Sequence, residues 1–166
     1  MYADVARWLA GFLADRHPKT DIRVFDASRR KLSRLIADEG LHSKVPPEWV
    51  SWDIYVDVVG VAVDAMQTHL AFVECKNNSP TLRDLSQLLG YSRIARPTYS
   101  FLISPNEPSD AVKSLIRTFN RVDVLQYHST SGKIPRAITL ARWLKNQKSI
   151  DWGNAISDDS IRIGRV

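Results

Sequence analysis

The sequence predicts an α/β fold in which helices cover a mixed central β-sheet. Three features lead to this prediction. Apolar residues recur at helical spacing in several segments, other segments are rich in Val, Ile, Trp and Tyr, and helices alternate with strands in the second half of the chain. The 166 residues, of which 44% are hydrophobic, are enough to bury a core. We therefore expect one domain over residues 1–166, with its core at roughly 49–127.

The first part of the chain is predicted to form helix, strand and helix. Five apolar residues at helical spacing define the first helix, namely Val5, Trp8, Leu9, Phe12 and Leu13. Pro18 ends this helix, and a strand at 22–27 follows. Ser28 is the expected N-cap of a second helix, which stops before Gly40. The inward residues of the second helix are expected to be Leu32, Leu35 and Ile36.

A strand hairpin is predicted to come next. Residues 41–48 contain two prolines and are expected to form a flexible loop. Residues 49–63 are rich in Val, Ile, Trp and Tyr, which favours strand over helix. A turn at 64–68 then joins this stretch to a strand at 69–76, so that the two pair antiparallel.

The next segments are predicted to be helix, strand and helix. Ser79 and Pro80 occupy the N-cap and the first position of a helix that Pro97 ends. The inward residues of this helix are expected to be Leu82, Leu85, Leu88 and Leu89. A strand at 99–103 follows, and Ser109 caps the next helix. The core residues of that helix are expected to be Val112, Leu115, Ile116 and Phe119.

The chain is predicted to finish with a strand at 122–127 and a helix at 138–147. The tail at 150–166 is expected at the periphery, either as an edge strand or as a loose end. The predicted order is therefore helices first, then a strand hairpin, and then alternating helices and strands. This order is typical of an α/β sandwich.

The charge and the cysteine content limit the functions that the protein can have. The chain has 23 Lys and Arg against 18 Asp and Glu, a net charge of +5 and a pI of 9.5, which favours a polyanionic partner. Cys75 is the only cysteine, which excludes an intramolecular disulfide and a thiolate zinc site. Neither a secretory signal nor an apolar run of about 18 residues is present, so we expect a soluble, cytoplasmic protein with no membrane partner.

Three charged residues stand inside predicted strands: Asp57, Glu74 and Lys76. Buried charges are usually paired or bind a metal, because burying an isolated charge is costly. Side chains alternate along a strand, so Glu74 and Lys76 project from one face, and a register that places Asp57 opposite Glu74 would bring all three together. Two carboxylates suit Mg²⁺, and the backbone carbonyl of Cys75 is a further oxygen ligand. Lys76 would orient or deprotonate the attacking water and offset negative charge.

Asp57 followed by Glu74-Cys75-Lys76 on a paired strand resembles the motif of the PD-(D/E)XK, or restriction-endonuclease-like, nuclease superfamily. The resemblance covers roughly residues 56–104. It implies an αβββαβ core, dependence on Mg²⁺ or Mn²⁺, and hydrolysis of phosphodiester bonds in DNA. It further implies that Asp57 and Glu74 are metal ligands, that Lys76 is the catalytic lysine, and that Gln87 on the following helix lies near the site.

Several alternatives to this assignment remain open. Val56 occupies the position of the family's proline, and Asp53 has the same strand parity as Asp57, which makes it an alternative ligand. Glu74 and Lys76 could instead form a cross-strand salt bridge on a solvated face. Some family branches contribute an acidic residue from the first helix, for which the candidates here are Asp4, Asp15 and Glu39.

We therefore expect a metal-dependent endodeoxyribonuclease of the repair, resolvase, restriction or mobile-element type. A homodimer is expected by analogy with family members that cut both strands. The alternative is a catalytically inactive module of the same fold that binds nucleic acid or a partner protein. The candidate phosphate-binding residues are Arg29, Arg30, Lys31, Arg93, Arg96, Lys133, Arg136, Arg142, Lys145 and Lys148.

Overall fold

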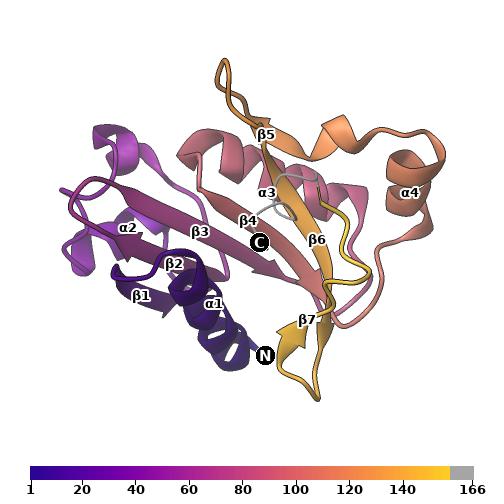
Figure 1. Ribbon diagram of the computed structural model, residues 1–166, viewed down its shortest axis with the longest axis horizontal. Coiled ribbons are helices and arrows are strands. Elements are labelled where there is room, and N and C mark those ends of the chain that lie inside the picture. The colour runs from indigo at the N-terminus through magenta and orange to yellow at the C-terminus, as the bar shows by residue number, and fades with distance from the viewer. Residues whose placement is uncertain (158–166) are drawn as a thin grey trace. The chain divides into compact units, whose positions relative to one another are not determined.

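The computed structural model describes residues 1–157, which belong to two compact units, one over residues 1–73 and one that begins at Glu74 (Figure 1). The first unit holds α1 (Tyr2–Arg16), β1 (Asp21–Asp26), α2 (Leu32–Asp38), the 3-10 helix η1 (Pro47–Ser51), β2 (Val58–Val63) and most of β3 (Thr68–Cys75). β2 pairs antiparallel with β1 and, from Thr68 to Val73, with β3. The predicted first helix, first strand and hairpin are confirmed.

α1 packs against β1 and β2 and buries four of the five apolar residues that predicted it, whereas Trp8 is half-buried. Gly60 in β2 allows this close approach. A Cβ atom at Gly60 would lie 2.8 Å from Leu13 Cδ1 and 2.9 Å from Leu9 Cδ2, and both leucines are fully buried. The helix therefore sits over a strand position that has no room for a side chain.

α2 begins four residues after the predicted cap, so the assignment of Ser28 as N-cap is wrong. The Ser28 hydroxyl instead donates to Asp26 Oδ1 at 2.7 Å. The free N–H groups of the first helical turn are satisfied by backbone carbonyls: Leu32 N donates to Ile54 O at 2.8 Å and Ser33 N to Trp52 O at 3.1 Å. The helix therefore starts where an extended segment can supply acceptors.

The strand predicted over 49–63 is present only from Val58. Residues 47–51 form η1 instead, and residues 52–57 belong to no helix or strand. Burial still alternates along this segment: Trp52, Ile54 and Val56 are buried, whereas the residues between them are exposed. The strand prediction is wrong for these residues, because the carbonyls of Trp52 and Ile54 bond to α2 rather than to a strand.

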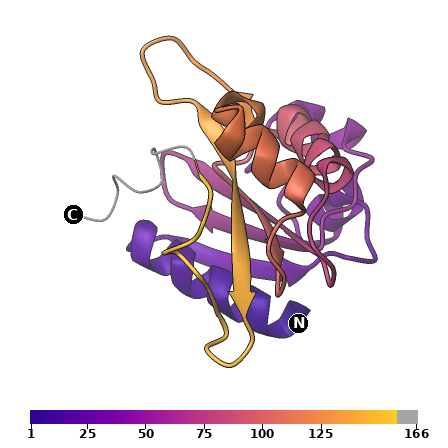
Figure 2. The same cartoon turned by 90° about the vertical axis from the view of Figure 1, so that its right-hand side faces the viewer.

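The second unit contains a mixed sheet. Its elements are α3 (Leu82–Ala95), β4 (Tyr99–Ser104), α4 (Asp110–Lys113), the π-helical turn η2 (Ser114–Thr118), the 3-10 helix η3 (Val122–Leu125), β5 (Gln126–His128), β6 (Arg136–Leu144) and β7 (Ser149–Ile150). β6 is parallel to β4 and antiparallel to β5 and β7, and α3 packs against β4 and β5. Figure 2 shows β6 running from the β5–β6 loop to the turn that leads into β7. The α/β class with mixed strand pairing and flanking helices is confirmed.

The helix predicted at 138–147 is wrong, because most of these residues form β6. Residues 137–141 are all buried in this central strand. A strand buried on both faces has a continuous apolar run, which periodicity does not distinguish from a buried helix.

Two predicted helix details also differ. α3 starts at Leu82 with Thr81 as its N-cap, so the assignment of Ser79 as cap is wrong. Ser109 does cap α4, accepting a hydrogen bond from Val112 N at 3.4 Å. The helix then continues as a π turn, whose extra residue per turn rotates Phe119 out of the predicted core stripe, and Phe119 is 70% exposed.

The remaining differences concern the strand at 122–127 and the tail. Residues 122–125 form η3, and only the short β5 continues as strand. In the tail, β7 and a bridge between Leu140 and Ile156 lie on β6. Residues 158–166 of the predicted tail lie outside the described residues. No helix within residues 1–157 has the length and apolar character needed to cross a bilayer.

Candidate functional site

The Lys76 ammonium lies between two carboxylates in the second unit. Lys76 Nζ is 3.0 Å from Glu74 Oε1 and 3.4 Å from Asp84 Oδ1. Glu74 is 5% exposed, and the Lys76 and Asp84 side chains are 25% and 21% exposed. A buried acid, an ammonium and a second acid therefore form one cluster, which we call the Lys76 cluster (Glu74, Lys76 and Asp84).

The strand geometry explains the contact between Glu74 and Lys76. The two residues are separated by Cys75 in an extended segment, so their side chains project from the same face. Lys76 N donates to Ile103 O at 2.8 Å, which fixes this segment beside β4. The predicted common face of Glu74 and Lys76 agrees with their hydrogen bond.

The loop that follows Lys76 is held by the end of β4 and the residues after it. Ser104 Oγ donates to Asn78 O at 2.9 Å, and Asn106 Nδ2 donates to Asn77 O at 2.9 Å. These bonds set the direction in which the chain enters α3, whose first turn then reaches the Lys76 cluster.

The third member of the cluster comes from the capping box of α3. Asp84 Oδ2 accepts hydrogen bonds from Thr81 N at 2.8 Å and from Thr81 Oγ1 at 2.7 Å, and Asp84 N donates to Thr81 Oγ1 at 3.4 Å. Its other oxygen, Oδ1, faces Lys76. One carboxylate therefore caps a helix and holds a lysine at the same time.

Local electrostatics keep both Asp84 and Lys76 charged. Burial acts to lower the pKa of Lys76, but the hydrogen bond and charge of Glu74 and the charge of Asp84 outweigh it, and the pKa is raised overall. Burial acts to raise the pKa of Asp84, but hydrogen bonds from Thr81 and the charge of Lys76 lower it below its ordinary value. Near neutral pH the cluster thus contains an ammonium and an Asp84 carboxylate.

Asp57 belongs to the first unit, where it directly precedes β2. It is half-buried, and its backbone carbonyl accepts a hydrogen bond from Ala27 N at 2.9 Å. The strand pairing next to it is between Val58 and Val73. The alternative ligand Asp53 is exposed and forms an ion pair with Lys31 at 2.7 Å.

The other predicted site residues have separate surroundings. Gln87 is exposed on α3, and its Nε2 donates to Tyr91 Oη at 3.1 Å. The Cys75 side chain is buried and forms no disulfide. Of the candidate first-helix acids, Asp4 forms an ion pair with Arg7 at 3.2 Å and Glu39 one with Arg30 at 3.2 Å, whereas Asp15 is exposed.

Asp84 is the member of the cluster that the sequence analysis did not identify. A signal for it exists, because Thr81 and Asp84 have the spacing of a capping box. That spacing predicts the start of a helix, but it does not predict that Asp84 contacts Lys76.

Neither a cluster of metal-ligating side chains among the described residues nor a match to a known protein identifies the function. Within residues 1–157, no three His, Cys, Asp or Glu side chains gather in a way that could hold a metal ion. No protein-family model, curated protein or solved structure matches the chain.

Proposed function

We propose that the protein is a metal-dependent nuclease that hydrolyses phosphodiester bonds in DNA, with Asp57, Glu74 and Lys76 as its catalytic residues. The observation that carries the proposal is the Lys76 ammonium held 3.0 Å from a buried Glu74 carboxylate. The Glu-x-Lys motif requires an acid and a lysine whose side chains lie within contact distance of each other. Along the chain, the order α1, β1, β2, β3, α3 and β4, with α2 inserted after β1, supports the αβββαβ assignment.

The donor chemistry fits Mg²⁺ or Mn²⁺. Asp57 and Glu74 offer hard carboxylate oxygens, and the Cys75 carbonyl would add a third oxygen. Asp57 directly precedes β2, and Glu74 lies near the end of β3. A bound ion would supply Lewis acidity toward the scissile phosphate and its attacking water.

The protein's own residues have distinct roles in this proposal. Lys76, as an ammonium, faces the negative charge that accumulates on the phosphate in the transition state. Glu74 fixes the position of Lys76, and Asp84 restrains it from the α3 side. Gln87 would contact a substrate phosphate, because it lies one turn after Asp84 on an exposed face of α3.

A cleavage assay tests the proposal. Supercoiled, linear, single-stranded and four-way-junction DNA are incubated with Mg²⁺ or Mn²⁺. We expect cleavage of at least one substrate that is abolished by EDTA and lost in Asp57→Ala, Glu74→Ala and Lys76→Ala, with Arg34→Ala as an exposed control that cuts normally. Binding without cleavage in any metal would favour the inactive module, and cleavage that persists in all three variants would place the site elsewhere.

A further inference from the structure

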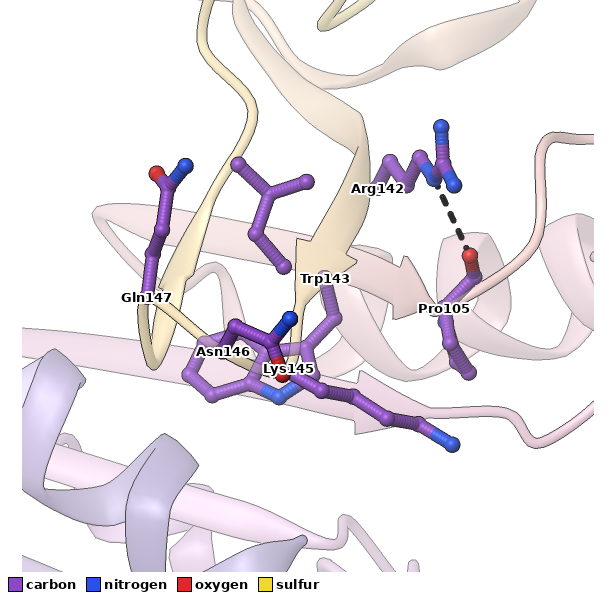
Figure 3. Close-up of a pocket in the computed structure, with 7 residues that line it drawn as sticks. Pro105, Arg142, Trp143, Lys145, Asn146 and Gln147 are labelled. Carbon is purple, nitrogen blue, oxygen red and sulfur yellow. Dashed lines mark hydrogen bonds between the residues drawn. The ribbon is translucent and has the colours of Figure 1, made fainter.

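The turn between β6 and β7 carries exposed positive charge. Arg142 at the end of β6 and Lys145 in the turn are both exposed. They line an open hollow of about 400 Å³ together with Pro105 and the amide side chains of Asn146 and Gln147, and none of its described lining residues is acidic. Figure 3 shows Arg142 and Lys145 extending on the side of β6 that faces Pro105.

The guanidinium of Arg142 is oriented by the protein. Its Nε donates to Pro105 O at 3.1 Å, as Figure 3 shows. Its two terminal nitrogens donate to no residue that the structure describes. A guanidinium held through Nε keeps the paired N–H donors that match two oxygens of a phosphate.

Asp151 lies near enough for Arg142 to affect it electrostatically. The pKa of Asp151 is lowered mainly by a hydrogen bond from Asn154, and the charge of Arg142 contributes least. The Asp151 carboxylate accepts hydrogen bonds from Asn154 Nδ2 at 2.8 Å and Gly153 N at 3.1 Å. Among the described residues, neither Arg142 nor Lys145 forms a salt bridge, so their charge is available to a ligand.

Three other candidate basic residues are engaged within the chain. Lys31 is paired with Asp53, and Arg30 is 3.2 Å from Glu39. Arg136, at the opposite end of β6, donates to Arg96 O at 2.7 Å, where it holds the end of α3. The β6–β7 turn therefore differs from Lys31 and Arg30 in presenting cations that form no salt bridge with an acid among the described residues.

We propose that Arg142 and Lys145 bind the phosphate backbone of nucleic acid at the β6–β7 turn. The identification of the polyanion as nucleic acid rests on the proposed nuclease function. Arg142 contacts one phosphate through its paired N–H groups, Lys145 contacts a neighbouring phosphate as a point charge, and Asn146 and Gln147 add donors at the rim. Contacts of this kind fix the substrate without reading its sequence.

Binding is measured by fluorescence anisotropy of a labelled DNA duplex in EDTA, so that cleavage does not contribute. Loss of two phosphate contacts in Arg142→Gln/Lys145→Gln should weaken binding by about tenfold or more and reduce the slope of log Kd against log salt by about 1.8. Arg7→Gln/Arg34→Gln removes the same net charge at two exposed residues that are paired with acids, and should change Kd by less than about twofold. Thermal denaturation checks folding, and Lys145→Glu repeats the test without disturbing the bond from Arg142 to Pro105.

Equal weakening in the two double variants, or no duplex binding by the wild-type protein at low salt, would overturn the inference. If the wild type binds through the turn but cuts no DNA with Mg²⁺ or Mn²⁺, the inference stands and the proposed nuclease function fails. If the wild type cuts DNA and the turn variants bind as tightly as it does, the nuclease stands and the turn does not bind phosphate.

Discussion

Among single residues, Asp84 connects the helix cap of α3 with the charge of Lys76. Its two carboxylate oxygens have different partners, Thr81 on one side and Lys76 on the other. A side chain that is held at one oxygen has little freedom at the other, so it restrains the ammonium at low entropic cost. We therefore assign Asp84 a positioning role in the proposed reaction.

Replacing Asp84 with asparagine should lower kcat of DNA cleavage by about tenfold to a hundredfold while KM changes little. The amide oxygen of the new side chain would still accept from Thr81, but the charge facing Lys76 would be lost, and small displacements of a catalytic group are costly. Steady-state kinetics at saturating Mg²⁺ measure the effect, and Asp84→Glu should recover part of the rate.

Thr81→Ala is the matched control for that variant, because it removes the cap hydroxyl but keeps both carboxylates and the hydrogen bond from the backbone N–H at position 81 to Asp84 Oδ2. It should cost about 1 kcal/mol of stability and leave kcat near the wild-type value at temperatures where the protein is folded. A kcat of Asp84→Asn equal to that of the wild type would show that Asp84 is only a cap.

His17 stacks on His69 in the first unit, with ring centroids 3.8 Å apart. Burial, followed by the charges of His69 and Arg16, lowers the pKa of His17 below its ordinary value of 6.5. The unfolded chain then binds more protons than the folded one below about pH 6.5, so this residue's contribution to stability is complete above that pH and is lost as the pH falls further.

We expect the free energy of unfolding to decrease as the pH falls below about 6.5, and His17→Gln to reduce that dependence. Urea denaturation between pH 5 and 8 measures it. His69→Gln should reduce the dependence in part, since it removes one of the causes of the shift. An unchanged slope in His17→Gln would contradict this assignment.

Among helices and strands, prediction succeeded where nearby residues determine the structure and failed where the backbone hydrogen bonds to residues distant in sequence. Periodicity identified α1, and the turn at Asp64 was expected from its chemistry: Asp64 Oδ1 accepts from Met66 N and Gln67 N, both at 2.7 Å. The start of α2 and the strand β6 were missed for a different reason. Each depends on backbone partners distant in sequence, Trp52 and Ile54 for α2 and β4 for β6.

The packing of α1 on β2 predicts the effect of Gly60→Ala. The new methyl group would meet the side-chain ends of Leu9 and Leu13, which are fully buried and would have to shift. We expect a loss of about 1–3 kcal/mol in the free energy of unfolding, measured by urea denaturation.

Gly90→Ala is the control for this variant. Gly90 lies within α3, and a Cβ atom placed there would have no neighbouring atom within 4 Å, so alanine should stabilise the helix by about 0.5–1 kcal/mol. A Gly60→Ala protein as stable as the wild type would contradict the packing of α1.

For the molecule as a whole, part of the candidate site follows from the local sequence pattern, and part depends on contacts between residues distant in the chain. Strand alternation was sufficient to place Glu74 and Lys76 on one face. Asp84 joins them because the loop after Lys76 is held by residues at the end of β4, some 26 to 29 positions later in the chain. The net charge of +5 favoured a polyanion but did not distinguish cations paired within the chain from those at the β6–β7 turn.

A crystal grown with Mn²⁺ and measured at the manganese absorption edge tests the proposed catalytic centre. We predict an anomalous peak within coordination distance of carboxylate oxygens from both Asp57 and Glu74, with the Lys76 ammonium nearby and unbound to the ion. Manganese found only at other residues, or no peak at millimolar Mn²⁺, would contradict the proposed metal site and with it the nuclease mechanism.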